Sequence, residues 1–247
     1  MNSVFTWIGG NSFCELKEIH VFLNSLKQNV ESDVFVFTNE ISDKMREIIY
    51  GLNFNLVEIK DPVVCVVRDR FYYYWKYVVE NKLQGNLLHV DSKDVLFQSD
   101  PFKFNCEKSI FLIEEGMKHE QSPWNMRDQH RHQRQLNSFH SDWRTWNVLN
   151  AGVMYGDANK LANLFFLIWS NLLTVKNESG TDQAVLNYLY HEHLFLDENI
   201  KIAPKNFCLT GESIVYGFVT PELEDFCIFH QWDRTEFKEE ILKKWAQ

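Results

Sequence analysis

Two carboxylates stand three positions apart directly after a short apolar run, in the segment His89-Val-Asp-Ser-Lys-Asp94. The apolar run after Gly85 predicts a buried strand over residues 86–90. Asp91 and Asp94 then lie on the loop at its carboxyl end, which is the edge where open α/β sheets bind ligands. Two such carboxylates can converge on a hard cation, Mg²⁺ or Mn²⁺, whose remaining coordination sites take phosphate oxygens. The alternative is a loop in which the Asp side chains accept hydrogen bonds from backbone amides.

Two arginines, Arg68 and Arg70, open a dense aromatic stretch that predicts a helix over residues 68–81. The helix face expected to pack in the core carries an i, i+3, i+4, i+7 pattern: Phe71, Tyr74, Trp75 and Val78. Both arginines fall on the same predicted sheet edge as Asp91, where a guanidinium suits a diphosphate. The alternative for them is an ion pair with Asp69 or Asp61.

Further polar side chains lie at the ends of later elements. Asn150 and Gly152 lie inside a strand predicted over residues 147–156, and His230 ends a strand predicted over residues 225–230. Asp182 and Gln183 follow Gly180 at the start of a helix, where they either cap the helix or face a pocket. Each of these positions is compatible with a site at one edge of a sheet.

The elements that must position these residues alternate along the chain. Strands are predicted at residues 4–8, 33–38 and 55–59, with helices at 13–28 and 43–51 between them. Ser42 is the expected N-cap of the second helix, and Gly51 its end. This β-α-β-α-β order predicts a parallel sheet with right-handed crossovers. Gly9 and Gly10 follow the first strand and allow a ligand to approach the backbone closely.

The later part of the chain predicts strands at residues 109–114 and 147–156, helices at 158–175 and from 181, and a short closing helix. The segment between the two strands, residues 116–146, is rich in Arg and His and has little apolar periodicity. It predicts a long functional loop or loosely helical insertion that closes over a substrate. The pair His130-x-His132 is a weak zinc signal without a second pair at defined spacing.

Composition limits the classes of protein. The 247 residues are 45% hydrophobic and 15% aromatic, which predicts one large domain. A net charge of -9 argues against nucleic acid or an anionic membrane as a partner, so a phosphate site must be built locally. The five cysteines include no CxxC pair, which predicts reduced thiols. No signal peptide or membrane-spanning run is evident, so a soluble, cytoplasmic protein is expected.

The ordered set of motifs resembles the GT-A nucleotide-sugar glycosyltransferases. The set comprises the Arg70-Phe-Tyr-Tyr-Tyr-Trp-Lys helix, the block from His89 to Phe102, Asn150-Ala-Gly152, Thr181-Asp182-Gln183 and the late His230. The resemblance implies an α/β, Rossmann-like fold with a mixed, mostly parallel central sheet flanked by helices. It also implies one catalytic domain over residues 1–247, with a donor-binding half at about 1–105 and an acceptor-binding half at about 106–247.

The resemblance also implies roles for individual residues. Asp91, Asp94 and His230 would hold Mn²⁺ or Mg²⁺, and Asp182 and Gln183 would be the catalytic pair. The residues implied to contact the donor are Gly9, Gly10, Arg68, Arg70, Asp91, Ser92, Lys93, Asn150 and Gly152. The motif here is D-x-x-D, with Lys93 at the third position where many members of the family have Asp. Lys93 could itself neutralise a phosphate.

The implied reaction moves a sugar from a nucleoside diphosphate, with uridine favoured, to a hydroxyl of a glycan or another acceptor. Inversion at the anomeric carbon would need a base, for which Asp182 is the candidate. With retention the leaving phosphate can accept the proton, and the Asn-Ala-Gly and Thr-Asp-Gln motifs favour retention slightly.

Two alternative functions would use the same predicted site. A sugar nucleotidyltransferase should have a Gly-rich loop with basic residues after the first strand, which Trp7-Ile-Gly-Gly-Asn-Ser-Phe lacks. A non-catalytic relative could bind nucleotide sugars without turnover if Lys93 has replaced a ligand. Dinucleotide and P-loop motifs are absent from the sequence.

Overall fold

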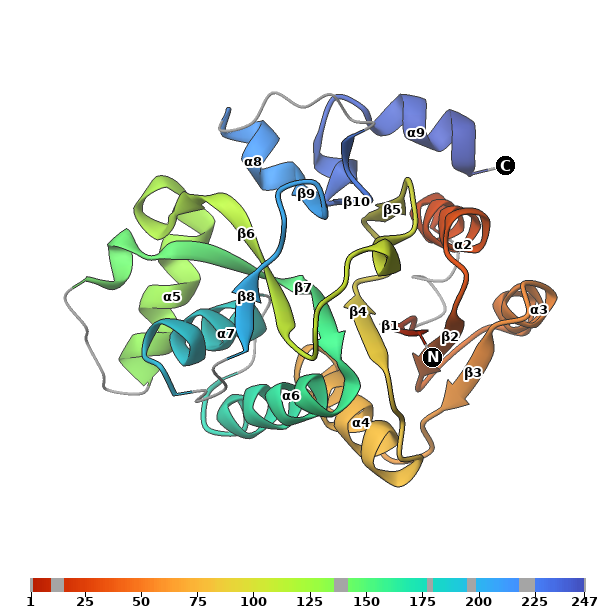
Figure 1. Ribbon diagram of the computed structural model, residues 1–247, viewed down its shortest axis with the longest axis horizontal. Helices are drawn as coiled ribbons and strands as arrows, with labels where there is room; N and C mark the ends of the chain where they lie inside the picture. Colours follow the sequence, from red (N-terminus) through yellow and green to blue (C-terminus); the bar gives the residue numbers. More distant parts are fainter. Residues whose placement is uncertain are drawn as a thin grey trace.

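The computed structural model describes residues 2–9, 16–135, 142–176, 180–194, 199–217 and 225–246. Its main sheet has seven strands in the order β3-β2-β1-β4-β7-β6-β8, with helices on both faces (Figure 1). The strands of this sheet are β1 (Asn2–Trp7), β2 (Asp33–Thr38), β3 (Asn55–Glu58), β4 (Asn86–Val90), β6 (Ile110–Lys118), β7 (Asn147–Asp157) and β8 (Ile200–Ile202). The helices are α2 (Lys17–Asn29), α3 (Asp43–Gly51), α4 (Val66–Glu80), α5 (Pro123–Gln135), α6 (Ala158–Leu172), α7 (Thr181–His191), α8 (Gly211–Val215) and α9 (Lys238–Trp245).

The first four strands form the parallel part of the sheet. β1 pairs in parallel with both β2 and β4, and β2 pairs in parallel with β3. The predicted β-α-β-α-β alternation is therefore confirmed, and β2 and β4 begin and end at the predicted residues. Ser42 caps α3 as predicted, because its hydroxyl accepts a hydrogen bond of 3.3 Å from the amide of Met45.

The second part of the sheet is mixed. β7 runs antiparallel to both β4 and β6, whereas β8 pairs in parallel with β6. The sheet as a whole is mixed and mostly parallel, with helices on both faces, as the sequence predicts. Strands from residues 1–105 and from residues 106–247 belong to this one sheet. The predicted donor-binding and acceptor-binding halves therefore share it.

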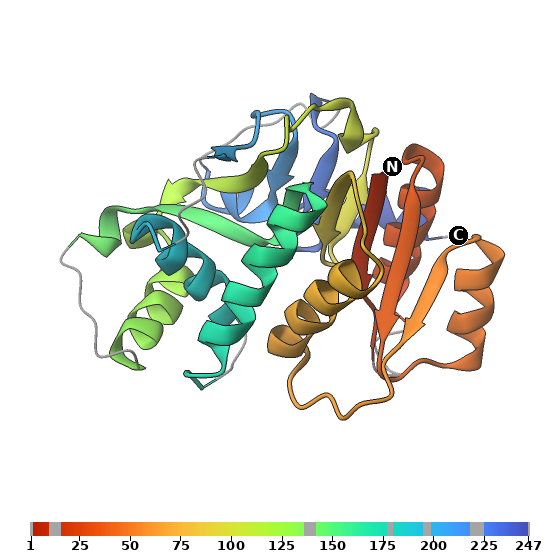
Figure 2. The same cartoon turned by 60° about the horizontal axis from the view of Figure 1, so that its bottom comes forward.

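Alternating side chains divide the core between the two faces of the sheet. Val4 of β1 packs with α2 and α3, and the next residue, Phe5, packs with α4 and α6. Figure 2 shows α4 and α6 lying side by side on one face. On that face Phe71, Tyr74 and Val78 of α4 are fully buried, which confirms three of the four residues of the predicted core stripe, whereas the fourth, Trp75, is only partly buried against the same cluster. This packing fixes α4, and with it Arg70 near the start of the helix, against the sheet.

A second, three-stranded sheet was not predicted. Its strands are β5 (Val95–Phe97), β10 (Ile228–His230) and β9 (Cys208–Thr210), in the order β5-β10-β9. It joins the loop after β4 to the end of the chain, at the top of Figure 1. The closing helix α9 packs on α2: the side-chain amide of Asn24 donates a 2.9 Å hydrogen bond to the carbonyl of Trp245.

Of the two forms predicted for residues 116–146, the helical insertion is confirmed over much of the segment and the long loop is wrong there. Its first residues extend β6, and residues 123–135 form the regular helix α5, while residues 136–141 lie outside the described residues. Five residues of α5 are buried polar side chains, so an apolar stripe could not reveal the helix: Asn125, Asp128, Gln129, His132 and Gln133. Within the described residues, no helix is long and apolar enough to cross a membrane.

Candidate functional site

Strand register determines where Asp91 lies. β4 pairs with β7 so that Val90 is opposite Val153, and the amide of Asp91 donates a 2.8 Å hydrogen bond to the carbonyl of Gly152. Ser92 continues the loop, and its hydroxyl donates a 2.8 Å bond to the carbonyl of Trp7 at the end of β1. The loop after β4 is therefore held at the carboxyl ends of two strands.

His230 reaches the same place through the small sheet. Val95, the residue after Asp94, is paired with His230 in the antiparallel register of β5 and β10. The amide of Gln231 also donates a 2.6 Å bond to the carbonyl of Asp94. Two segments far apart in the sequence are thereby brought together, with their side chains at one edge of the main sheet.

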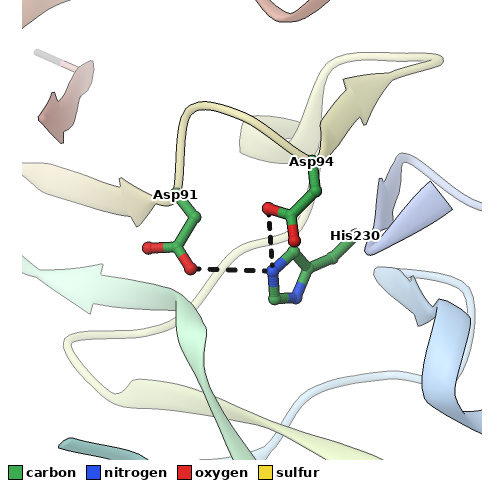
Figure 3. A group of neighbouring side chains, drawn as sticks. All are labelled: Asp91, Asp94 and His230. Atoms are coloured by element: carbon green, nitrogen blue, oxygen red, sulfur yellow. Dashed lines mark ion pairs between the residues drawn. The ribbon is translucent and has the colours of Figure 1, made fainter. Parts of the chain in front are cut away.

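Asp91, Asp94 and His230 point toward one another (Figure 3). His230 Nε2 lies 3.5 Å from Asp94 Oδ1 and 3.7 Å from Asp91 Oδ2, and one ligand atom from each residue lies within 4.8 Å of the others. Two carboxylates and one imidazole are donors suited to Mn²⁺ or Mg²⁺. The three side chains predicted to hold a metal ion are therefore brought together.

The electrostatics of this cluster fit a cation. Burial alone would lower the pKa of His230, but the charges and hydrogen bonds of Asp94 and Asp91 outweigh it and raise the pKa to about 10. Positive charge is therefore stabilised between the two carboxylates, which is also where a metal ion would be held. The cluster is largely enclosed, because the side chains of Asp94 and His230 are 14% and 3% exposed.

Gly152 provides the space for the cluster. A Cβ atom at this position would lie 2.5 Å from His230 Cε1 and 2.7 Å from Asp91 Oδ2. A Cβ atom essentially never approaches a non-bonded heavy atom this closely, so one of the two side chains would have to move. The predicted donor-contact residue Gly152 therefore lies directly against the candidate cation site.

Arg70 joins this cluster to Asp182. One guanidinium nitrogen donates to Asp91 and the other lies 2.7 Å from Asp182 Oδ2. Burial raises the pKa of Asp182, and the charge of Arg70 partly opposes this effect. For Asp91, burial is outweighed by Arg70 and His230, which hold the pKa well below its usual range. The predicted arginine and the predicted catalytic carboxylate are therefore direct partners.

A buried amide network lies behind this arrangement. Its centre is Glu115, which accepts hydrogen bonds from the amides of Asn150 at 2.7 Å, Asn125 at 3.4 Å and Gln183 at 3.4 Å. Burial raises the pKa of Glu115, and the nearby charge of Glu212 acts in the same direction. The network fixes which way the amide groups of the two predicted site residues, Asn150 and Gln183, point.

Two adjoining cavities meet at the cluster. The first, about 390 Å³, is lined on its own side by Trp7, Gly9, Ser92 and Lys93, among others. The second, about 170 Å³, is lined on its own side by Trp124, Gly152, Gly180, Asp182, Gln183 and His230, among others. Four residues line both cavities: Arg70, Asp91, Asp94 and Arg234. Two of the candidate metal ligands, Asp91 and Asp94, therefore form the border between the two compartments together with two guanidinium groups, and His230 lies on the side of the second cavity.

The remaining predicted donor contacts fall into three groups. Lys93 lines the first cavity, and its ammonium group lies 3.5 Å from Asp233 Oδ2. Arg68 follows the alternative, because its guanidinium pairs with Asp69 at 2.5 Å and it is not among the residues that line the two cavities. Gly9 lines the first cavity, whereas Gly10 lies outside the described residues.

Sequence reasoning missed several residues at the site. Arg234 borders both cavities and donates a 2.8 Å bond to Glu212 Oε1, while its other nitrogen is 3.8 Å from Asp94 Oδ2. Its position shortly after His230 was a signal that could have been used. Glu115 and Trp124 had no such signal, because nothing in their spacing relates them to Asp182.

The weak zinc signal at His130 and His132 has no structural support. Among the described residues, the group able to hold a metal ion is Asp91, Asp94 and His230. The ring of His132 is buried against Tyr188, whereas the exposed His130 stacks on Trp143. The two histidines therefore lie on different sides of α5.

No model of a known protein family matches this sequence, and no curated protein matches it. Solved structures do match in fold. One is the galactosyltransferase LgtC in complex with donor and acceptor sugar analogues, with a TM-score of 0.61 and 14% identity, over 100% of this chain and 95% of that one. An active-site mutant of LgtC matches with the same values. The mixed sheet, its flanking helices and this full-length similarity together show that the chain has the GT-A fold.

Proposed function

We propose that this protein is a glycosyltransferase that moves a sugar from a nucleoside diphosphate to a hydroxyl acceptor in the presence of a divalent cation. The observation that carries the proposal is the convergence of Asp91, Asp94 and His230 at the border of two cavities. The GT-A fold is consistent with it. We take the donor to be a UDP-sugar, because the sequence motifs resemble those of the GT-A nucleotide-sugar glycosyltransferases. The acceptor is a glycan or another hydroxyl compound.

The border residues account for the binding of a diphosphate. A divalent ion held by the two carboxylates and the imidazole would supply positive charge to the leaving diphosphate. Arg234, which is 43% exposed and reaches both cavities, can donate charge-assisted hydrogen bonds to phosphate oxygens. Lys93, also 43% exposed, is a second donor from the first cavity. These groups would balance the charge of the diphosphate although the protein as a whole is acidic.

We assign one cavity to the nucleoside of the donor and the other to its sugar. The first lies at the carboxyl ends of β1 and β4, where α/β folds bind nucleosides, so we place the nucleoside there. The second contains Asp182 and Gln183, so we place the sugar there. The anomeric bond would then lie at the border, beside the groups that stabilise the leaving diphosphate.

The surroundings of Asp182 favour retention. In the reaction the bond from the anomeric carbon to the phosphate oxygen breaks, and a bond to the acceptor oxygen forms. Asp182 Oδ2 is paired with Arg70 and its Oδ1 accepts a 2.9 Å bond from the amide of Gln183, so both oxygens are engaged. As the proton acceptor of an inverting reaction, Asp182 would become neutral and lose its ion pair with Arg70. We therefore propose that the acceptor proton passes to the leaving diphosphate.

The test is release of nucleoside diphosphate from a panel of donors: UDP-glucose, UDP-galactose, UDP-N-acetylglucosamine and GDP-mannose. With Mn²⁺ or Mg²⁺ the protein should hydrolyse at least one donor slowly and transfer its sugar faster when an acceptor is present, and chelator should abolish both. Asp94→Ala should lower both rates by about 100-fold or more, because a ligand of the cation is lost. Nuclear magnetic resonance of the product reports the anomeric configuration.

Asp43→Ala is the matched control, because the side chain of Asp43 is fully exposed on α3. It should leave the rates unchanged. Donor binding without turnover under all these conditions would instead identify a non-catalytic nucleotide-sugar-binding protein. If no donor is bound or hydrolysed, the proposed function is wrong.

A further inference from the structure

The sugar-side cavity has one aromatic wall, and the proposed catalytic residues lie beside it. Trp124 is in the first turn of α5 and is partly exposed, and it lines the second cavity together with Asp182 and Gln183. It is not among the residues that line the first cavity. Trp124 therefore lies on the sugar side of the metal cluster, away from the compartment assigned to the nucleoside.

The indole of Trp124 packs on Gly180, a position at which no other residue type fits. Gly180 is the N-cap of α7 and has a φ of +83°, a conformation that side-chain-bearing residues rarely adopt. A Cβ atom at Gly180 would lie 2.6 Å from Trp124 Cζ2 and 2.8 Å from Cη2. The edge of the indole thus packs directly on the backbone of Gly180, two residues before Asp182. This contact fixes the distance between the aromatic ring and the carboxylate.

The next residue of α5 is hydrogen-bonded to α7. Asn125 is 2% exposed, and its side-chain oxygen accepts a 2.7 Å hydrogen bond from Gln183 Nε2. Its amide nitrogen donates to Ser122 Oγ at 3.0 Å and to Glu115 at 3.4 Å. The first turn of α5 is therefore tied to the start of α7 at two consecutive residues, one buried and polar, the other aromatic and partly open to solvent.

An aromatic ring beside polar groups can bind both the apolar face and the hydroxyl groups of a sugar ring. A pyranose has one face of C–H groups that packs on an aromatic surface, while its hydroxyls bond to amides, carboxylates and guanidinium groups. The second cavity supplies all of these: Trp124, Gln183, Asp182 and the two arginines at the border. The aliphatic hydroxyl of a serine, a threonine, glycerol or a lipid alcohol has no comparable flat face that presents hydroxyls at its edge.

We infer that Trp124 is the platform for the acceptor, and that the acceptor is a pyranose saccharide rather than a peptide, lipid or polyol hydroxyl. The inference rests on the proposed function and adds the class of the acceptor and the residue that selects it. The donor sugar occupies the part of the cavity beside the metal cluster, and the acceptor approaches its anomeric carbon along the partly exposed indole. Loss of the ring weakens acceptor binding, so water competes better for the donor.

The experiment compares transfer with hydrolysis in the wild type, Trp124→Leu and Trp124→Phe, with the donor identified in the panel above. The acceptor probes are methyl glucosides, methyl galactosides and lactose, with glycerol and a serine-containing peptide as acceptors of other classes. Trp124→Leu should lower the ratio of saccharide transfer to donor hydrolysis about tenfold through a higher acceptor KM. Trp124→Phe should retain the ratio within about threefold, because an aromatic face remains.

Trp245→Leu is the matched control, because Trp245 lies at the end of α9 and is not among the residues lining either cavity. Its ratio should equal that of the wild type. The inference is overturned if Trp124→Leu keeps the wild-type ratio, if hydrolysis and transfer fall equally, or if only the peptide or glycerol accepts sugar. A wild type that neither binds nor hydrolyses any donor overturns the proposed function itself, which is a different result.

Discussion

A side chain at position 152 would occupy the space in which Asp91 and His230 approach each other. The sequence shows only that Gly152 follows Asn150 in a strand. The structure gives the reason for glycine, which is steric: a Cβ would lie 2.5 Å from His230 and 2.7 Å from Asp91. The geometry of the candidate cation site therefore depends on glycine at position 152 as well as on Asp91, Asp94 and His230.

Gly152→Ala should weaken cation binding without unfolding the protein. The added methyl group pushes one ligand away, and displaced or misoriented ligands typically lower metal affinity by about 10-fold to 100-fold. Isothermal titration calorimetry with Mn²⁺ measures the change directly. Gly51→Ala is the control, because no atom lies within 4 Å of a Cβ at that position. Equal Mn²⁺ affinity in Gly152→Ala and the wild type would contradict the assigned site.

The helix α5 packs against α7, and its buried side chains are polar. Gln129, His132 and Gln133 are each at most 1% exposed, yet their side-chain nitrogen and oxygen atoms find no hydrogen-bond partner within the described residues. Burial lowers the pKa of His132 to about 4, so the ring is neutral in the folded protein near pH 7. Such unpaired polar burial costs free energy, and protonation of the ring would cost more.

This helix should make the protein sensitive to acid. The pKa of His132 falls from 6.5 in the unfolded chain to about 4 in the folded protein. The unfolded chain therefore binds the proton more tightly, and stability present above pH 6.5 is lost as the pH falls toward 4. Between pH 7 and pH 5 this one group should lower the free energy of unfolding by about 2 kcal/mol.

His132→Leu should remove that part of the loss. The measurement is urea unfolding at pH 7 and pH 5 for both proteins, with the pH difference compared between them. His193→Asn, at an exposed position, serves as the control. If the pH difference of His132→Leu equals that of the wild type, His132 is not the origin of the acid sensitivity.

At the scale of the whole molecule, the candidate site joins segments that are far apart in the sequence. Asp91 and Asp94 follow β4, Asp182 begins α7, and His230 ends β10, the last strand of the chain. A ligand that contacts all of them binds the folded protein and not the unfolded chain. Binding therefore stabilises the fold as a whole, by an amount set by the ratio of ligand concentration to Kd.

Mn²⁺ together with UDP should raise the melting temperature. At a concentration 100 times Kd the expected stabilisation is about 2.7 kcal/mol. Differential scanning fluorimetry with and without chelator measures it, and Asp94→Ala should show little shift. An equal shift in the wild type and in Asp94→Ala would mean that the ligand binds elsewhere.

The sequence by itself determined several of the elements and the edge at which the site lies. Strands β2 and β4, the cap at Ser42 and the core stripe of α4 follow from local patterns of apolar and capping residues, which act within a few positions of each other. For the same reason, the place of Asp91 and Asp94 at the carboxyl end of a strand follows from the amino-acid pattern alone.

Only the tertiary structure decided which distant side chains meet. Arg70 pairs with Asp91 and Asp182, whereas Arg68, two residues earlier, pairs with its neighbour Asp69. The directions differ because side chains two positions apart on a helix point to different faces. The partners of Glu115 and Trp124, and the small sheet that brings His230 to Asp94, depend on strand register and on the packing of α5 against α7. These contacts are set by the burial of whole elements against each other, a property that no spacing of residues along the chain records.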